Sequence, residues 1–214
     1  MKSFFNLFTD SAKSLKELRT LTTTGMLLAL AVAIRSLAIQ ITLDIRIVFT
    51  FLPICVIAML YGPVVCGIST TALDLIGFII DNKSARGYSW ELAMIVLLSG
   101  VFYGLFLYKK DISKIDFKSI VSILLARGSV IIICNIVLNS YFLYHLYINK
   151  DFSVLTLFEG SELRNAFITW WTPRITKNLV QFPIDAVLLA IVLPAANTAY
   201  KTVMKHSFRR SKAN

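Results

Sequence analysis

The sequence predicts an all-α integral membrane protein with six transmembrane helices and both termini in the cytoplasm. Of its 214 residues, 57% are hydrophobic and only 16% are charged, and the mean hydropathy is +0.71. This composition is too apolar for an ordinary soluble domain. The apolar residues also gather into segments long enough to cross a hydrocarbon core of about 30 Å. We therefore expect residues 1–214 to form a single membrane domain.

Six apolar segments are expected to form a bundle of helices over residues 22–200. They lie at residues 22–41, 46–61, 63–81, 91–108, 119–146 and 174–200. The second segment is short and carries Pro53, which predicts a kink or an interruption. Gly62 and Pro63 then break the apolar run, so a very tight turn should join the second span to the third.

The basic residues predict the orientation of the bundle. The N-terminal tail, the loop 109–118 and the C-terminal tail hold 13 of the 22 Lys and Arg residues. Because cytoplasmic segments carry an excess of Lys and Arg, these three should be cytoplasmic, and the longest loop, 147–173, should face outward. Residues 1–20 are expected to form a cytoplasmic interfacial helix or, alternatively, a frayed tail, and residues 201–214 a basic tail. Basic residues placed beside apolar runs argue against nucleic-acid binding.

A polar stripe marks the start of the sixth span. Arg174, Lys177, Asn178 and Gln181 follow i, i+3, i+4, i+7 spacing, which stacks them on one side of a helix. An ionisable group at the centre of a span costs at least about 2.5 kcal/mol. The stripe should therefore face the bundle interior or a watery cavity, where it is a candidate for ligand binding.

A second candidate is Asp74, which is interpreted as the one acidic residue in the middle of a span. Its carboxylate requires a cationic or donor partner. That partner is either Arg35 or Lys177 within the protein, or a ligand rich in donors. Arg35 has the alternative of extending to the outer interface, and Arg127 is expected to extend to the cytoplasmic interface.

Other polar and aromatic groups lie near the predicted outer half of the bundle. Asn135 and Asn139 are spaced i, i+4 and should share one face of the fifth span, where they bond a neighbouring helix or a ligand. Tyr88, Ser89 and Trp90 close a short outer loop. An aromatic belt at the membrane interface would explain the two rings without any ligand.

Gly25, Ala29 and Ala33 recur every four residues and form a flat strip on the first span. Such a strip serves either close packing within the bundle or docking of a different membrane subunit. The sequence contains no nucleotide-binding glycine loop, no hydrolase signature and no metal-spaced set of Cys and His. No catalytic site, cofactor or metal is therefore expected.

Several segments together resemble one family of transporters. They are FTFLP (49–53), YGPVVCG (61–67), ALDLIG (72–77), SGVFYGLFLYKK (99–110), NIVLNSYFLYHLY (135–147) and PRITKNLVQFPI (173–184). With the six spans and the small-residue strip, the chain looks like the folate-family substrate-binding S component of energy-coupling factor (ECF) transporters over about residues 20–195. The resemblance implies a multi-pass subunit of a prokaryotic plasma membrane that binds folate, or a close derivative, with high affinity from outside. It also implies an ECF-type ABC importer with a transmembrane coupling subunit and two cytoplasmic ATPase subunits as partners.

The resemblance also implies roles for the candidate residues. Asp74 would hold the adjacent ring N–H and amino donors of a pterin, and Phe49, Tyr88 and Trp90 would contact its rings. Basic residues near the pocket mouth would meet the two carboxylates of the glutamate tail. The full expected binding set is Asp74, Arg35, Arg46, Phe49, Arg86, Tyr88, Ser89, Trp90, Asn139, Arg174, Lys177 and Asn178, and the expected docking set is Gly25, Ala29 and Ala33. The loop 82–90 departs from the family pattern because it is more basic.

Three other functions remain open. The first is an S component for another small vitamin, such as a pyrimidine, a queuosine precursor or pantothenate, although a neutral ligand would leave the basic pocket overcharged. The second is a small membrane enzyme acting on lipid, with Asp74 and Lys177 as acid and base, which the lack of a nucleophile or metal set disfavours. The third is a stand-alone ion-coupled transporter, which the lack of a detectable inverted repeat disfavours.

Overall fold

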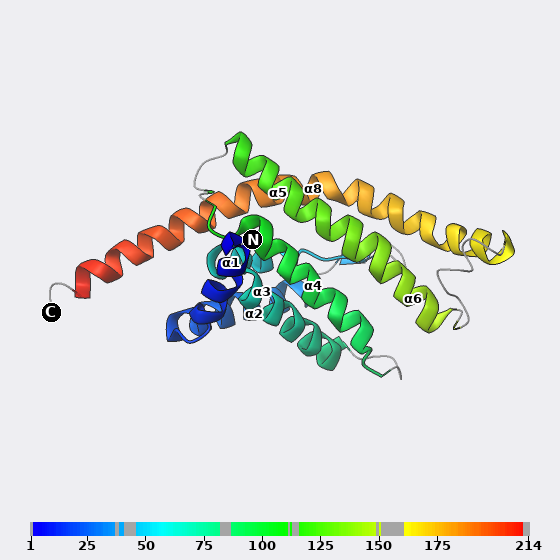
Figure 1. Ribbon diagram of the computed structural model, residues 1–214, viewed down its shortest axis with the longest axis horizontal. Coiled ribbons are helices and arrows are strands. Elements are labelled where there is room, and N and C mark those ends of the chain that lie inside the picture. The colour runs from blue at the N-terminus through cyan, green and yellow to red at the C-terminus, as the bar shows by residue number, and fades with distance from the viewer. Residues whose placement is uncertain are drawn as a thin grey trace.

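The computed structural model describes residues 2–36, 39–40, 46–81, 87–110, 112, 116–148, 150 and 161–211, and these residues are almost entirely helical. The elements, in chain order, are α1 (Lys2–Ser14), α2 (Leu18–Ser36), β1 (Ile39–Gln40), β2 (Arg46–Ile47), α3 (Phe51–Asp81), α4 (Trp90–Leu107), α5 (Phe117–Ser129), the π-helix η1 (Val130–Asn139), α6 (Ser140–Tyr147) and α8 (Ser161–Ser211). The helices form an elongated bundle from which the C-terminal part of α8 projects (Figure 1).

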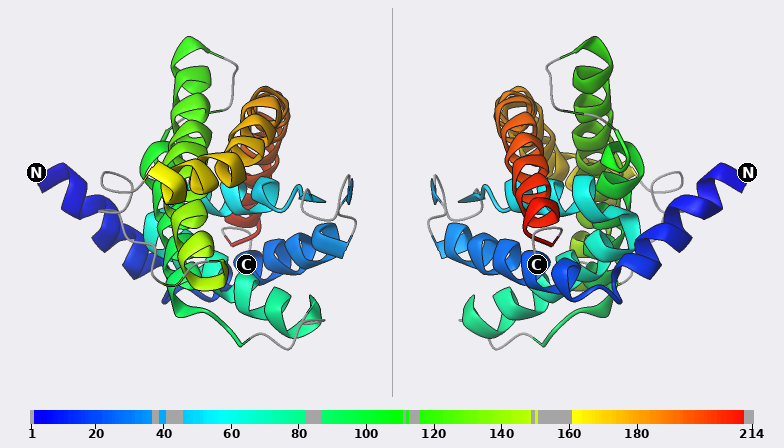
Figure 2. Two further views of the ribbon diagram at one scale, coloured as in Figure 1. Left: turned by 90° about the vertical axis from the view of Figure 1, so that its right-hand side faces the viewer. Right: turned by 90° about the vertical axis from the view of Figure 1, so that its left-hand side faces the viewer.

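The helices agree with the predicted all-α membrane bundle. Among the described residues, five helical stretches are long and apolar enough to cross a membrane: α2, α3, α4, the continuous rod α5–η1–α6, and α8. Helix α3 consists of two helices joined at a kink at Gly62. It therefore accounts for the second and third predicted spans, which brings the bundle to six helices. Viewed along its long axis, the bundle has α8 and the α5–α6 rod on one side and α2 and α3 on the other (Figure 2).

The kink in α3 is where the sequence predicts a tight turn. Gly62 has a φ of 86°, a backbone conformation that only glycine adopts readily. Ser11 of α1 fills the break: its hydroxyl donates to the Tyr61 carbonyl at 2.6 Å and accepts from the N–H groups of Val64 and Val65 at 3.1 and 3.3 Å. Helix α1 thus supplies, from another part of the chain, the oxygen that caps the second half of α3.

Helices α3 and α4 pack closely because two glycines face α3. A Cβ atom on Gly104 would lie 2.3 Å from the Cα of Pro63, and one on Gly100 would lie 2.8 Å from the Cys66 carbonyl oxygen. Glycines four residues apart remove side chains from one face, so two helix backbones can approach. The apolar core beside this contact is fully buried and includes Ile57, Leu107, Leu189 and Leu193.

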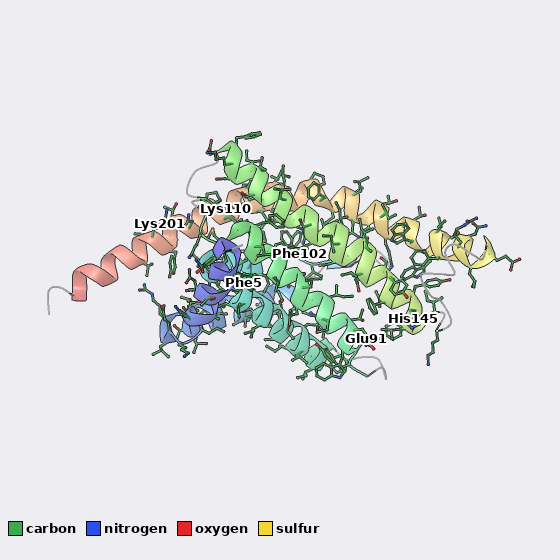
Figure 3. All side chains as sticks on the ribbon, viewed as in Figure 1. Phe5, Glu91, Phe102, Lys110, His145 and Lys201 are labelled. Atoms are coloured by element: carbon green, nitrogen blue, oxygen red, sulfur yellow. The ribbon has the colours of Figure 1, made fainter. Side chains whose placement is uncertain are left out.

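The two ends of the bundle carry different residues. Lys110 and Lys201 lie toward one end, and Glu91 and His145 lie toward the other (Figure 3). Lys109 forms an exposed ion pair with Asp10 of α1 at the basic end. This arrangement agrees with the predicted orientation, in which the basic end faces the cytoplasm.

The predicted bounds differ from the observed ones at four places, one of which is the end of the sixth span, since α8 continues through Ser211 and not only to residue 200. Helix α8 begins at Ser161, so Trp170 and Trp171 belong to a helix and not to an outward loop as predicted. Membrane helices tolerate proline, so Pro173 does not end this one. The first span ends at Ser36 and not at residue 41, because Gln40 pairs with Arg46 in the β1–β2 ladder. For the same reason, the second span begins at Phe51.

Candidate binding site

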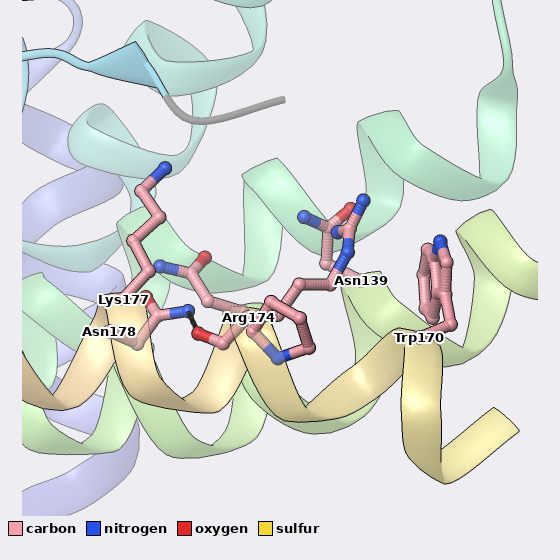
Figure 4. Close-up of a pocket in the computed structure, with 7 residues that line it drawn as sticks. Asn139, Trp170, Arg174, Lys177 and Asn178 are labelled. Atoms are coloured by element: carbon pink, nitrogen blue, oxygen red, sulfur yellow. Dashed lines mark hydrogen bonds between the residues drawn. The ribbon is translucent and has the colours of Figure 1, made fainter. Parts of the chain in front are cut away.

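A cavity of about 390 Å³ opens between α8 and η1. It is lined by Asn135, Asn139, Trp170, Pro173, Arg174, Lys177 and Asn178, which we call the α8 cavity. The side chains of Arg174, Lys177 and Asn139 extend from their two helices into the same space (Figure 4). Small-molecule sites have volumes of roughly 300–1,000 Å³. Three of the four residues of the predicted polar stripe, Arg174, Lys177 and Asn178, therefore line a cavity of ligand size, and Gln181 is not among its lining residues.

Contacts within α8 and with its neighbour hold the cavity wall. The Arg174 guanidinium lies 4.1 Å from the centre of the Trp170 ring, in a cation–π contact. The Asn178 amide donates to the Arg174 carbonyl at 2.8 Å. The Trp171 indole N–H donates to the Ile136 carbonyl of η1 at 2.9 Å, which ties the two walls together.

The opposite wall is a π-helix. Residues 130–139 carry the wider i→i+5 hydrogen-bond pattern, and the Ser140 hydroxyl donates to the Asn135 carbonyl at 3.1 Å. π-Helical turns are rare in proteins overall, but those that occur are often found at functional sites. The prediction that Asn135 and Asn139 share one face is confirmed, because both line the α8 cavity.

A buried ion pair lies farther along α8 and corrects two predictions. Arg127 of α5 donates to one carboxylate oxygen of Asp185 from Nη2 at 2.6 Å and from Nε at 3.0 Å. It also bonds the hydroxyl of Tyr103 and lies 4.4 Å from the centre of the Phe51 ring. Arg127 therefore does not extend to the interface, because a carboxylate on a neighbouring helix provides a closer partner. Asp74 is also not the only acidic residue within a span, since Asp185 is fully buried.

Asp74 lies on α3 and accepts a hydrogen bond from the Tyr88 hydroxyl at 2.9 Å. The Tyr88 ring makes edge contacts with Phe78 at 5.2 Å and Trp90 at 5.5 Å between centroids. Burial, reinforced by the neighbouring carboxylate, raises the pKa of Tyr88 to about 12. Tyr88 therefore stays protonated at neutral pH and donates to Asp74 throughout the physiological range.

Arg35 reaches the same part of α3. A Cβ atom on Gly77 would lie 2.2 Å from Cζ of Arg35, so the guanidinium occupies the space that the glycine leaves open. Gly77 follows Asp74 by three residues, which places both on one helical face, about 4.5 Å apart along the axis. Asp74, Tyr88 and Arg35 thus form a second polar group, which we call the α3 cluster.

The remaining predicted residues lie around these two groups. The Ser89 hydroxyl is 2.8 Å from that of Tyr147, which links the start of α4 to the end of α6. Trp90 is 73% exposed, and the Phe49 ring is 6.5 Å from that of Phe51. Arg46 lies in β2, opposite Gln40, and Arg86 lies outside the described residues.

The binding set from the sequence lacked three residues that line the α8 cavity. Asn135, Trp170 and Pro173 belong to its wall. Trp170 precedes Arg174 by four residues and so shares the face of the polar stripe, but its aromatic character favoured an interface position. Among the described residues, no group of three His, Cys, Asp or Glu side chains is placed to hold a metal ion.

The small-residue strip of α2 lies on the outer surface. Gly25, Ala29 and Ala33 are exposed, and a Cβ atom on Gly25 would meet nothing within 4 Å. Ala31, on the other side of the helix, is fully buried. In this part of the structure, the strip is available to a partner and does not pack inside the bundle.

Comparison with known proteins gives consistent matches. Residues 19–193 match the family model for the substrate-specific component of ECF transporters. The chain is 31% identical to a folate transporter FolT of Clostridium novyi over 155 residues, which are 72% of this chain and 76% of the relative. It is 28% identical to FolT of Leuconostoc mesenteroides over 163 residues, or 75% and 78% of the two chains. Its fold is similar to a crystal structure of FolT bound with folic acid, with a TM-score of 0.63, 28% identity, and coverage of 81% of this chain and 91% of that one.

Proposed function

Because this chain belongs to the family of ECF transporter substrate-specific components, we propose that it binds folate, or a close derivative, and presents it for import. The names of its relatives and the folic acid in the similar crystal structure support this ligand. Within the chain, the observation that carries the proposal is the α8 cavity, in which Arg174 and Lys177 on one wall face Asn135 and Asn139 on the other.

We assign the α8 cavity to the glutamate tail of folate. The tail carries two carboxylates, and a guanidinium and an ammonium on one helical face offer charge-assisted hydrogen bonds to both. The contact with Trp170 holds the Arg174 guanidinium at the cavity wall. The asparagine amides of Asn135 and Asn139 add donors on the opposite wall.

We assign the pterin ring to Asp74. A carboxylate matches the paired ring N–H and amino donors of a pterin in bidentate fashion. Asp74 is half-buried and accepts one hydrogen bond from Tyr88, through Oδ2. The aromatic rings of Tyr88 and Trp90 are suited to contact with a flat heterocycle. Arg35, packed against Gly77 one turn away, places a guanidinium on the same face of α3 as Asp74.

The protein acts in a membrane, as its family and its apolar helices require. We propose that it resides in the plasma membrane and joins a transmembrane coupling subunit and two cytoplasmic ATPases. The exposed strip of Gly25, Ala29 and Ala33 supports docking to the coupling subunit, because small side chains let a partner helix approach. In this role the chain contributes binding, and its partners supply the energy.

The decisive experiment identifies the ligand. The chain would be purified in mild detergent, its bound small molecule identified by mass spectrometry, and folate titrated into ligand-free protein by calorimetry. We expect a bound folate and saturable binding at one site. Co-purification of a different vitamin, with no heat from folate, would overturn the assignment and favour another branch of the same family.

A further inference from the structure

The ion pair between Arg127 and Asp185 lies outside the α8 cavity, yet it joins the two helical rods that form the cavity. Arg127 belongs to the rod α5–η1–α6, which supplies Asn135 and Asn139. Asp185 belongs to α8, which supplies Arg174 and Lys177. The side chains of the pair are 8% and 0% exposed. Because the ion pair joins the two rods, its geometry can fix the rotation of one cavity wall relative to the other.

The spacing along α8 relates the pair to the cavity. Asp185 follows Arg174 by eleven residues, which places the two side chains within about 20° of each other around a regular helix and about 16 Å apart along it. Asn178 lies within about 20° of the same direction. A rotation of α8 that moved Asp185 away from Arg127 would therefore turn Arg174 and Asn178 out of the cavity.

Helix α8 is continuous between the cavity and the pair, so a rotation at Asp185 is transmitted to Arg174. Pro183 lies in this stretch and has no N–H to donate to the Leu179 carbonyl, so α8 lacks one backbone hydrogen bond there. In the other rod, the π-helix begins three residues after Arg127 and changes the number of residues per turn.

We propose that Arg127 and Asp185 are positioning residues, whose buried ion pair fixes the rotation of α8 and thereby directs its polar cavity-lining side chains, Arg174, Lys177 and Asn178, into the cavity. The pair suits this role because a buried charge is stable only while its partner stays at contact distance, which restricts the relative positions of the two helices. Replacing a buried ion pair by apolar residues is often neutral for stability, so the stability of the fold alone gives little reason for the pair. A register role is the best-attested use of such pairs. The inference concerns the folate site proposed above, but helix rotation is measurable without any ligand.

The test removes the pair without leaving a buried charge. One cysteine at a time would be introduced at Lys177, in the cavity wall, or at Leu179, which is 70% exposed, and labelled with a water-soluble thiol reagent. The native cysteines, Cys55, Cys66 and Cys134, are buried, and labelling of the chain without an added cysteine gives the background rate. In the otherwise unaltered chain, we expect Lys177→Cys to react much faster than Leu179→Cys, because the latter faces lipid. In the variant Arg127→Leu with Asp185→Leu, we expect the ratio of the two rates to fall about tenfold, a size typical of coupling between sites.

A matched control is the exposed ion pair of Asp10 and Lys109, which touches neither rod of the cavity. Asp10→Asn with Lys109→Gln should leave the ratio of labelling rates unchanged. If the apolar double variant does not fold, Arg127→Lys keeps the charge but loses the paired contact of Nε and Nη2, and a smaller fall in the ratio is expected. An unchanged ratio in a folded Arg127 or Asp185 variant would overturn the proposal.

Folate titration separates this inference from the proposed function. In the folded double variant, we expect folate affinity to fall about tenfold together with the labelling ratio. If the labelling ratio falls in a chain that never binds folate, the positioning role stands and the ligand assignment fails. If folate binds with equal affinity to both proteins, the pair does not position the site, and the ligand assignment stands.

Discussion

Two carboxylates within the spans have different surroundings. Asp185 is fully buried and lies 2.6 Å from the guanidinium of Arg127, whereas Asp74 is half-buried and accepts a hydrogen bond from the neutral hydroxyl of Tyr88. A carboxylate that already has a cation at contact distance in a dry core has its charge compensated within the protein. A carboxylate held by a hydroxyl at a partly open wall still accepts strong donors. On this difference we propose a structural role for Asp185 and a binding role for Asp74.

The largest effect on stability is expected when the Asp185 carboxylate is removed from Arg127. Asp185→Ala leaves Arg127 buried without its carboxylate, which should lower the free energy of unfolding by about 3–5 kcal/mol. Thermal unfolding in detergent would detect this as a clear fall in the midpoint. Asp10→Asn also removes one partner of an ion pair, but an exposed one, and should leave the midpoint nearly unchanged. A wild-type midpoint for Asp185→Ala would remove the distinction between the two carboxylates.

Removing the charge of the other carboxylate should act on ligand binding. Asp74→Asn should weaken folate binding by about 2 kcal/mol, because it breaks a charge-assisted pair and offers a poor match to the pterin donors. The unfolding midpoint should change little, since Tyr88 can still donate to the amide oxygen. Calorimetry on monodisperse protein provides the measurement. Unchanged affinity would exclude Asp74 from the binding site.

The cations of the α8 cavity extend the comparison. Arg174→Ala and Lys177→Ala should each reduce folate affinity by about 1.5 kcal/mol, the size of a hydrogen bond to a charged group. A pterin compound without the glutamate should lose much less. Arg164→Ala is the matched control, because Arg164 lies on the same helix but is exposed. Equal losses for both ligands would mean that Arg174 and Lys177 support the fold or the ring pocket.

The smallest effect on the isolated chain is expected at the strip of α2. Replacing Ala29 and Ala33 by Leu should change folate affinity by less than about 0.5 kcal/mol, because both positions are exposed on the outer face of α2. Uptake, and co-purification with the ATPase subunits, should be lost because bulk blocks close helix approach. Met26→Leu changes a neighbouring exposed side chain and should preserve both. Loss of folate binding in the strip variant would refute a docking role.

Local sequence signals predicted the parts of the fold that depend on local chemistry. The apolar segments, the turn at Gly62 and the shared face of Arg174, Lys177 and Asn178 follow from composition, glycine conformation and helical periodicity. These features need no knowledge of which helices are neighbours. Each is present in the structure, and the polar stripe leads directly to the α8 cavity.

The parts that the sequence did not predict depend on contacts between distant residues. Arg127 and Asp185 are 58 residues apart, so their pairing is fixed by helix packing and not by spacing. When no partner is known, an arginine near a helix end is expected to extend its charged group to the interface. The π-helix and the early start of α8 likewise have no distinct residue pattern. The polar residues that line the cavity on α8, and Asn139 on η1, were therefore predicted, but the contacts that join the two rods were not.

The contact of Ser11 with the α3 kink has a consequence for biosynthesis. Ser11 leaves the ribosome fifty residues before Tyr61, so α1 exists before the backbone groups that it caps. Until the first two spans have been inserted, α1 is expected to stay bound at the cytoplasmic surface of the membrane, where a helix with one apolar face is stable. Closing the kink is then a late step that requires the N-terminus to have stayed on that side. A fusion that drew α1 across the membrane would leave the amides of Val64 and Val65 without the Ser11 oxygen.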